Sequence, residues 1–199
     1  MAVPDLTLEG LVHDLNNVFQ TIAENAELLE DDPKWEEMAH KLQRCAGHGH
    51  RIAHSILEQN RSTTELAPIL QNASQFCQDT LESANRPKME FCTDLQPELR
   101  LKGDEAGWER VFVNLFLNSA QAGARKIRIC AHSDQIVVSD DGPGISLDLL
   151  PRIFEPRVST KSIISGLGLN VVKSIVEQNG GSVSAENGPG GGAIFTLAL

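Results

Sequence analysis

The chain has 199 residues, enough for one or two domains, and its 41% hydrophobic content argues against intrinsic disorder. Its formal net charge is −10, with 11 acidic and 5 basic side chains in residues 1–62 and 16 acidic and 12 basic side chains in the remainder. Because both parts are acidic, we expect no nucleic acid among the partners of this protein.

The cysteines and the distribution of apolar residues predict a soluble, cytoplasmic protein. The four cysteines show neither the paired spacing of a metal site nor the density of a disulfide scaffold, so free thiols in a reducing compartment are expected. No apolar run approaches the roughly 20 residues that cross a bilayer, and the N-terminus lacks the pattern of a signal peptide. We therefore expect no membrane segment.

Apolar residues recur at helical spacing over residues 8–29 and predict an amphipathic helix. The segment Asp31-Asp32-Pro33 ends it, and a second amphipathic helix is predicted from near Pro33 to about Leu57, weakened in its middle by Gly47 and Gly49. The polar face of the first helix carries Glu9, His13, Asn16, Asn17, Gln20, Glu24 and Glu27.

Two amphipathic helices joined by a short turn cannot bury both of their apolar stripes alone. We therefore predict a homodimer in which two hairpins form an antiparallel four-helix bundle, with His13 on its outer, solvated surface. Residues 1–62 are assigned to this dimerisation hairpin and residues 63–199 to a second domain, with a polar linker over residues 61–64.

The second domain alternates helical and strand patterns and predicts an α+β sandwich with helices on one face of a sheet. Helices are expected over residues 66–82, 104–122 and 167–179. Strands are expected over residues 87–94, 99–102, 125–131, 135–140, 181–187 and 192–198.

The helix at residues 104–122 carries a polar stripe that could bind a metal ion. Asn114 and Asn118 lie on it together with Arg110 and Gln121. Asparagine oxygens are suitable ligands for Mg²⁺, which needs only one or two protein donors when nucleotide phosphates supply others. On spacing alone, these side chains could equally face solvent.

Two glycine-containing turns could bind the rest of a nucleotide. Asp140 ends an apolar strand and precedes Gly142 and Gly144, so that a carboxylate could accept a hydrogen bond from an exocyclic amine while the glycines let the backbone approach a flat ligand. Gly166 and Gly168 precede a predicted helix, whose N-terminus could bind a phosphate. Each turn alone could also be an ordinary surface turn.

Taken in order, these segments resemble the N, G1, F, G2 and G3 boxes of bacterial sensor histidine kinases, preceded by their H box. The resemblance covers nearly the whole chain, and the ordered set is far more specific than any one member. The matching segments are His13-Asp14-Leu15-Asn16-Asn17, Asn114 with Asn118, Asp140-x-Gly142-x-Gly144, Ile153-Phe154-Glu155-Pro156, Gly166-x-Gly168 and Gly190-Gly191-Gly192.

The resemblance implies a catalytic core without a sensor domain: a dimerisation hairpin followed by a Bergerat-fold ATP-binding domain that uses ATP and Mg²⁺. It also implies a role for each matching position. Asn118 would chelate Mg²⁺, Asn114 and Gln121 would contact phosphate or metal, Asp140 would bind the adenine amine with Gly142 and Gly144 beside it, Phe154 would belong to the lid, Lys161 would contact phosphate, and Gly166 and Gly168 would clasp the phosphates.

The implied function is ATP-dependent autophosphorylation of His13, followed by phosphoryl transfer to an aspartate of a response-regulator receiver domain. A neutral histidine is a good nucleophile near physiological pH, and the adjacent Asp14 could orient the ring and accept its proton. Asn17 lies one helical turn further on and could orient a water that dephosphorylates the regulator.

The sequence departs from the family pattern at two positions. Ile164 stands where the glycine-rich stretch usually has another glycine, which puts the flexibility of the lid or the affinity for nucleotide in doubt. Val18 stands where a proline usually follows the H box, which predicts a straighter first helix. Asn114 also occupies the place of the water-activating glutamate in related ATPases such as gyrase, so slow hydrolysis is expected.

Two alternatives from other classes remain open. The chain could be a histidine phosphotransfer relay with a degenerate ATP-binding domain, although the intact Asp140 and Gly142 argue against it. It could also be a Bergerat-fold ATPase or serine kinase, which would have no use for the His13 hairpin. His13 is preferred over the other histidines because only it is followed by an acid and, four residues on, by an asparagine; the rivals are His40, His48, His50, His54 and His132.

Overall fold

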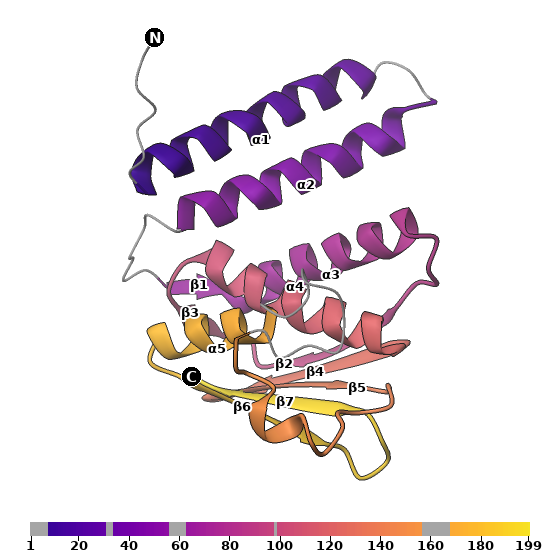
Figure 1. Cartoon of the computed structure of the whole chain (residues 1–199), viewed down its shortest axis with the longest axis vertical. Coiled ribbons are helices and arrows are strands. Elements are labelled where there is room, and N and C mark those ends of the chain that lie inside the picture. Colours follow the sequence, from indigo (N-terminus) through magenta and orange to yellow (C-terminus); the bar gives the residue numbers. More distant parts are fainter. Residues whose placement is uncertain (1–7, 31–33, 56–62, 98, 157–167) are drawn as a thin grey trace. The chain divides into compact units, whose positions relative to one another are not determined.

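The computed structural model describes residues 8–30, 34–55, 63–97, 99–156 and 168–199 (Figure 1). The chain divides into two compact units, Met1–Arg61 and Ser62–Leu199. Among the helices within these described ranges, none is long and apolar enough to span a membrane.

The first unit is a hairpin of α1 (Leu8–Glu30) and α2 (Glu36–Ser55). Its interface is made of small and branched side chains spaced by whole heptads, which keeps them on one face of each helix. The buried apolar residues are Val12 and Ala26 on α1 and Ala39, Ala46 and Ala53 on α2.

The apolar stripe of α1 is wider than the surface that α2 covers. Leu11 and Val18 remain 56% and 54% exposed, and Leu15 and Ile22 are exposed as well. Asn16, expected on the polar face, is instead half-buried, because it lies one helical turn after the buried Val12. Its Oδ1 atom is buried and has no hydrogen-bond partner among the residues that the structure describes.

Helix α2 runs without interruption through both of its glycines, although the sequence predicted a weak point there. A Cβ atom at Gly49 would overlap the Phe19 ring of α1, whereas at Gly47 it would make only an ordinary contact, 3.5 Å from Arg51 Nη1. The glycine at position 49 is therefore explained by close packing of the two helices rather than by flexibility.

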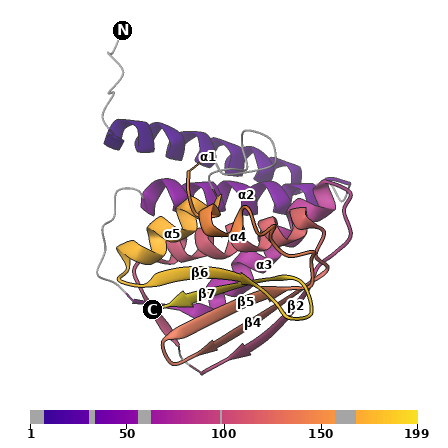
Figure 2. The same cartoon turned by 60° about the horizontal axis from the view of Figure 1, so that its bottom comes forward.

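The second unit is a two-layer α+β sandwich, as the sequence predicts, with helices on one face of a five-stranded sheet (Figure 2). The strand order is β2-β4-β5-β7-β6, in which β2 and β4 are parallel and the other neighbours antiparallel. The helices are α3 (Leu66–Ser83), α4 (Glu105–Ala122) and α5 (Gly168–Gln178). The strands of the sheet are β2 (Glu90–Leu95), β4 (Lys126–His132), β5 (Gln135–Asp140), β6 (Ser182–Asn187) and β7 (Ala193–Ala198).

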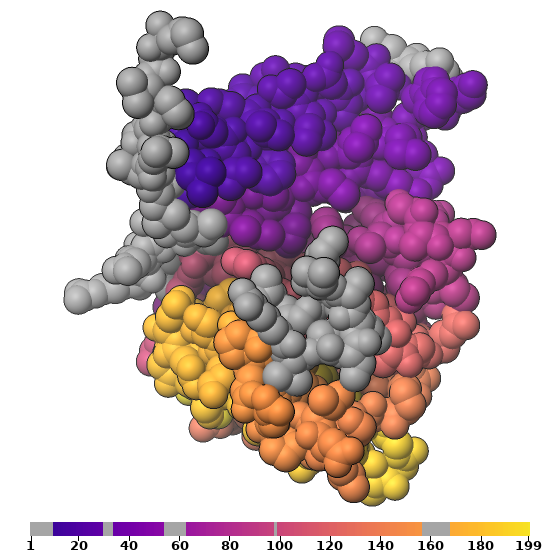
Figure 3. Space-filling view, viewed as in Figure 1, coloured from indigo at the N-terminus to yellow at the C-terminus, as the bar shows by residue number. Residues whose placement is uncertain are grey.

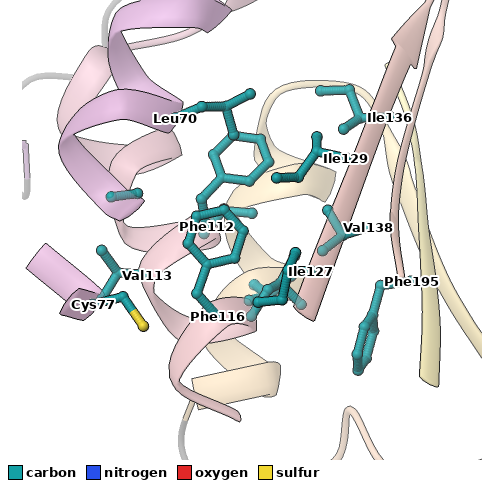
Figure 4. Close-up of a cluster of buried hydrophobic side chains, with 14 of the residues drawn as sticks. Leu70, Cys77, Phe112, Val113, Phe116, Ile127, Ile129, Ile136, Val138 and Phe195 are labelled. Atoms are coloured by element: carbon teal, nitrogen blue, oxygen red, sulfur yellow. The ribbon is translucent and has the colours of Figure 1, made fainter. Parts of the chain in front are cut away.

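The core lies between α4 and the inner face of the sheet (Figure 4). Phe112 and Phe116, one turn apart on α4, are fully buried with ring centroids 6.1 Å apart. Alternate residues of the central strands face them, including Ile127 and Ile129 of β4 and Val138 of β5. This packing fixes the central helix and the end of β5, which carry most of the predicted nucleotide residues.

Two short elements differ from the predicted ones. The prediction of a linker over residues 61–64 is wrong at Thr63 and Thr64, because these residues belong to a strand, β1 (Thr63–Glu65). This strand pairs with β3 (Arg100–Lys102) outside the main sheet. The Arg100 guanidinium fastens this pair through the Thr63 hydroxyl and the Glu65 carboxylate. A 3₁₀-helix over Leu150–Arg152 lies between the predicted strand of residues 135–140 and the predicted helix of residues 167–179, where the sequence predicts neither a helix nor a strand.

Candidate functional site

His13 lies on the exposed face of α1, the indigo helix that reaches the surface in Figure 3. Its side chain is 74% exposed and that of Asp14 is 73% exposed. The Nδ1 atom of His13 lies 3.2 Å from Asn17 Nδ2 and 3.7 Å from Asp14 Oδ1. The structure therefore groups these three predicted residues around one accessible imidazole.

The two neighbours of His13 favour different positions of its proton. The Asn17 amide can donate only to an unprotonated Nδ1, whereas the Asp14 carboxylate attracts a proton to that atom. At 3.7 Å the Asp14 contact is longer than a hydrogen bond, so the Asn17 contact is the one formed. A small movement of Asp14 toward the ring would favour a proton on Nδ1 and leave Nε2 with its lone pair exposed.

On α4 the predicted polar stripe converges on the start of α5. A Cβ atom at Gly168, the first residue of α5, would lie 2.8 Å from Asn114 Oδ1 and 3.7 Å from Asn118 Nδ2. Asn114 also donates from Nδ2 to the Arg110 carbonyl at 2.7 Å, which fixes its carboxamide. Both asparagines thus face the first described residue of a helix, and the N-terminus of a helix is suited to binding an anion.

Asn118 carries an open hydrogen-bonding group at this point. Its Nδ2 atom is buried and has no partner within the described parts of the chain. A buried amide without a partner is costly, and a ligand that supplied one would be bound more tightly. Gln121, predicted to contact phosphate or metal, is exposed on the last turn of α4.

The carboxylate of Asp140 is held by donors on both of its oxygens. Oδ1 accepts the backbone N–H groups of Gly142 and Ala193 at 2.9 and 3.1 Å. Oδ2 accepts the hydroxyl of Ser119 at 2.7 Å. Because Ser119 directly follows Asn118, one turn of α4 connects the Asp140 region with the asparagines at α5.

Glycines and one asparagine shape the backbone around Asp140. Gly144 has φ +80° and lies against Asn187, whose side chain accepts the Ile145 N–H and donates to the Ile145 carbonyl, both at 2.7 Å. Gly192 has φ +81°, and a Cβ atom there would overlap the carbonyl oxygen of Asp140. Only glycine adopts this positive φ without strain and also leaves room for the Asp140 carbonyl oxygen at position 192.

The neighbouring Asp141 has a structural role. It accepts the backbone N–H groups of Arg125 and Lys126 at 2.7 and 2.9 Å. The hydrogen bond from the Lys126 backbone and then that from Arg125 lower the pKa of the Asp141 carboxyl. This side chain therefore fastens the start of β4 to the end of β5.

Phe154 packs against α5 at the base of the predicted lid. Its carbonyl accepts Asn170 Nδ2 at 3.1 Å, and its ring borders a cavity of about 530 Å³ that Lys173 and Glu177 also line. The predicted phosphate contacts Lys161 and Gly166, together with Ile164, lie outside the described residues.

Sequence reasoning missed Ser119 and Asn187 as parts of the Asp140 site, and it identified Gly192 only as a member of a glycine motif, without its contact to Asp140. Ser119 follows the asparagine pair and could have been found from its place on α4, but only the fold shows that it faces β5. The four cysteines are present as thiols rather than disulfides, and burial raises the pKa of the Cys77 thiol to about 12, which leaves it unreactive.

Comparisons with known proteins agree with this geometry. Residues 103–199 match the family described as histidine kinase-, DNA gyrase B-, and HSP90-like ATPase. The sensor histidine kinase ZraS of Klebsiella oxytoca is 31% identical over 208 residues, which cover 96% of this chain and 44% of that kinase. The signal transduction histidine-protein kinase AtoS of Escherichia coli K12 is 26% identical over 208 residues, 96% of this chain and 34% of that protein. The chain thus spans less than half the length of these relatives.

Solved structures extend the agreement to the fold. The catalytic domain of the histidine kinase ThkA matches with a TM-score of 0.59 and 26% identity over 71% of this chain and 95% of that domain. Full-length ShkA, solved in complex with AMPPNP, matches 98% of this chain and 45% of its own length with a TM-score of 0.59 and 20% identity, which supports the fold alone. The chain therefore belongs to the sensor histidine kinases, of which it represents the helical hairpin and the ATPase-type domain.

Proposed function

We propose that this chain transfers the γ-phosphoryl group of Mg·ATP to His13 and then passes it to an aspartate in the receiver domain of a response regulator. The observation that carries the proposal is the presence, in one chain, of an exposed histidine beside a carboxylate and of a cradle formed by Asp140, Asn118 and Gly168. A phosphotransfer module alone would not need the nucleotide cradle, and an ATPase domain alone would not need the exposed histidine.

In this proposal ATP binds along α4. Asp140 accepts a hydrogen bond from the exocyclic amine of adenine, and Gly142 and Gly144 leave room for the base. The phosphates lie at the N-terminus of α5, where Gly168 keeps the backbone accessible. By family resemblance, Lys161 and Gly166 complete the phosphate site.

The residues at this point suit a Mg²⁺ ion that is bound partly by the nucleotide. Asn118 has a buried amide without a partner among the described residues, and a half-turn of that carboxamide would present its oxygen. No group of three or more acidic, histidine or cysteine side chains in the described ranges could hold a metal alone. Bound Mg²⁺ would neutralise charge on the phosphates. Asn114, being an amide rather than a carboxylate, would not activate water for hydrolysis.

The reaction itself is a direct phosphoryl transfer. A ring nitrogen of His13 forms a bond to the γ-phosphorus while the bond from that phosphorus to the bridging oxygen breaks, and ADP leaves with the electron pair. The ring proton passes toward Asp14. The phosphoryl group then moves from nitrogen to an aspartate oxygen of the regulator, and the imidazole is regenerated.

We also infer that the functional unit is a homodimer. Leu11, Leu15, Val18 and Ile22 form an exposed apolar stripe on α1, where a second hairpin would remove them from water. His13 and Asn17 lie outside this stripe and would stay accessible to ATP and to a regulator.

Labelling with γ-phosphate-labelled ATP and Mg²⁺ tests the function directly. His13→Gln should reduce labelling by about 100-fold or more, because the nucleophile is lost, while nucleotide binding to the second unit persists. His50→Gln, a change at another exposed histidine of the hairpin, should label like the unaltered protein. The product should be labile to acid and should map to His13.

Each rival function makes a different prediction in the same assay. A phosphotransfer relay with a degenerate domain would not bind ATP, and a serine kinase would give an acid-stable product. Labelling of His13→Gln at the original level would exclude His13 as the acceptor.

A further inference from the structure

Ser119 is a buried polar side chain that the proposed reaction does not use. It lies on α4, is 3% exposed and donates its hydroxyl to Asp140 Oδ2 at 2.7 Å. A serine inside a helix usually bonds to a carbonyl three or four residues earlier in the same helix. Ser119 instead bonds to a carboxylate 21 residues away, at the end of β5.

The three donors on Asp140 come from three different elements. Gly142 belongs to the turn after β5, Ala193 begins β7, and Ser119 lies on α4. Both backbone donors bind Oδ1, so without Ser119 the other oxygen would have no protein donor among these contacts and the carboxylate could rotate. The Ser119 hydroxyl is therefore the contact that sets the direction of Oδ2.

We propose that Ser119 is a positioning residue that sets the preference of the site for a 6-aminopurine nucleotide. The inference rests on the proposed binding of ATP and assigns the choice of base to a residue beyond Asp140. A carboxylate has about four acceptor positions, of which three are used here, so that one on Oδ2 remains for the exocyclic amine.

The same arrangement disfavours guanine. A guanine base has a carbonyl oxygen where adenine has its amine, so that two acceptors would face each other. Because Ser119 already gives its proton to Asp140, it has no second proton with which to relieve that contact. The preference for ATP over GTP should therefore depend on how firmly the Ser119 hydroxyl holds the Oδ2 atom of Asp140.

The test compares nucleotides that differ only at the 6-position of the purine. Binding of ATP, GTP and purine riboside triphosphate, which lacks the 6-amine, is measured by calorimetry on the whole chain. Ser119→Ala should weaken ATP binding by about 10-fold, the scale expected for a hydrogen bond to a charged group, and leave the binding of purine riboside triphosphate unchanged. The preference for ATP over GTP should fall accordingly.

Ser83→Ala is the matched control, because it removes a serine hydroxyl on another helix that donates to the Asp79 carbonyl at 2.7 Å in a partly buried hydrogen bond. It should change neither affinity nor preference. Equal weakening of ATP and purine riboside triphosphate by Ser119→Ala would indicate a general structural role and overturn the inference, as would an unchanged ATP affinity. If the unaltered protein bound no ATP, the proposed function would fail instead.

Discussion

Asn17 and Asp14 both approach the Nδ1 atom of His13, and the two side chains suit different chemical roles. Asn17 Nδ2 is the nearer group, at 3.2 Å from Nδ1, whereas Asp14 is at 3.7 Å. Phosphoryl transfer to the ring needs a proton acceptor, which is the role proposed for Asp14. The amide of Asn17 cannot accept a proton from the ring in this way, but it can orient a water molecule.

The first residue-scale prediction follows from this difference. Asn17→Ala should leave autophosphorylation near normal and slow the stimulated dephosphorylation of the regulator by about 10-fold or more, because an orienting group is lost. The measurement is the decay of phosphorylated regulator in the presence of each protein. Gln20→Ala, which changes another exposed amide on the polar face of α1, serves as the control. Equal decay rates for Asn17→Ala and the unaltered protein would leave Asn17 as a surface residue only.

Residues at the Asp140 site differ in how far the sequence predicts them. Asp140, Gly142 and Gly144 lie together in one short motif, so their grouping follows from spacing. Ser119 donates to the carboxylate from a position 21 residues earlier, and Gly192 packs against the Asp140 backbone carbonyl from a position 52 residues later. Their contribution depends on the pairing of β5 with β7 and on the rotation of α4, which no local pattern determines.

At the scale of secondary structure, the spacing of apolar residues predicted the long helices reliably, whereas very short elements could not be predicted from it. The predicted helices of residues 8–29, 66–82 and 104–122 agree with α1, α3 and α4 to within a residue or two. Of the two three-residue strands of the small sheet, β3 lies within the predicted strand of residues 99–102, whereas β1 was missed because three residues are too few to show an alternating pattern. The parallel pairing of β2 with β4 likewise depends on the path of the chain rather than on local sequence.

The glycines of α2 give a prediction about the hairpin. A change from glycine to alanine inside a helix normally stabilises it by about 1 kcal/mol. Gly47→Ala should follow this rule, because its Cβ would find only ordinary contacts. Gly49→Ala should instead destabilise the hairpin by about 1–3 kcal/mol, because the Phe19 ring occupies the space.

Amide hydrogen exchange of α1 and α2 in the whole chain measures these effects for the hairpin alone, which matters because the two units need not unfold together. Protection should rise in Gly47→Ala and fall in Gly49→Ala. A rise in both would show that the ring of Phe19 moves aside without cost and that the glycine is not required for packing.

At the scale of the whole molecule, the two units have different requirements for stability. The second unit encloses its own core between helices and sheet. The hairpin buries mainly small residues and leaves Leu11, Leu15, Val18 and Ile22 exposed. The sequence predicts this imbalance, since a single partner helix cannot cover so wide a stripe. It follows that nucleotide binding should be independent of self-association, whereas the stability of the hairpin should depend on it.

The last prediction separates these two properties with one pair of substitutions on α1. Val18→Lys places a charge in the middle of the exposed stripe and should weaken the dimer by about 3 kcal/mol, or about 100-fold in its dissociation constant, because the charge would lose its water. Gln20→Lys adds the same charge on the polar face and should leave the dimer intact. Sedimentation should therefore give half the mass for Val18→Lys at concentrations where Gln20→Lys remains dimeric, while both bind ATP equally. A dimeric Val18→Lys protein would show that the stripe is not the interface, and a loss of ATP binding with the dimer would show that the second unit depends on its partner.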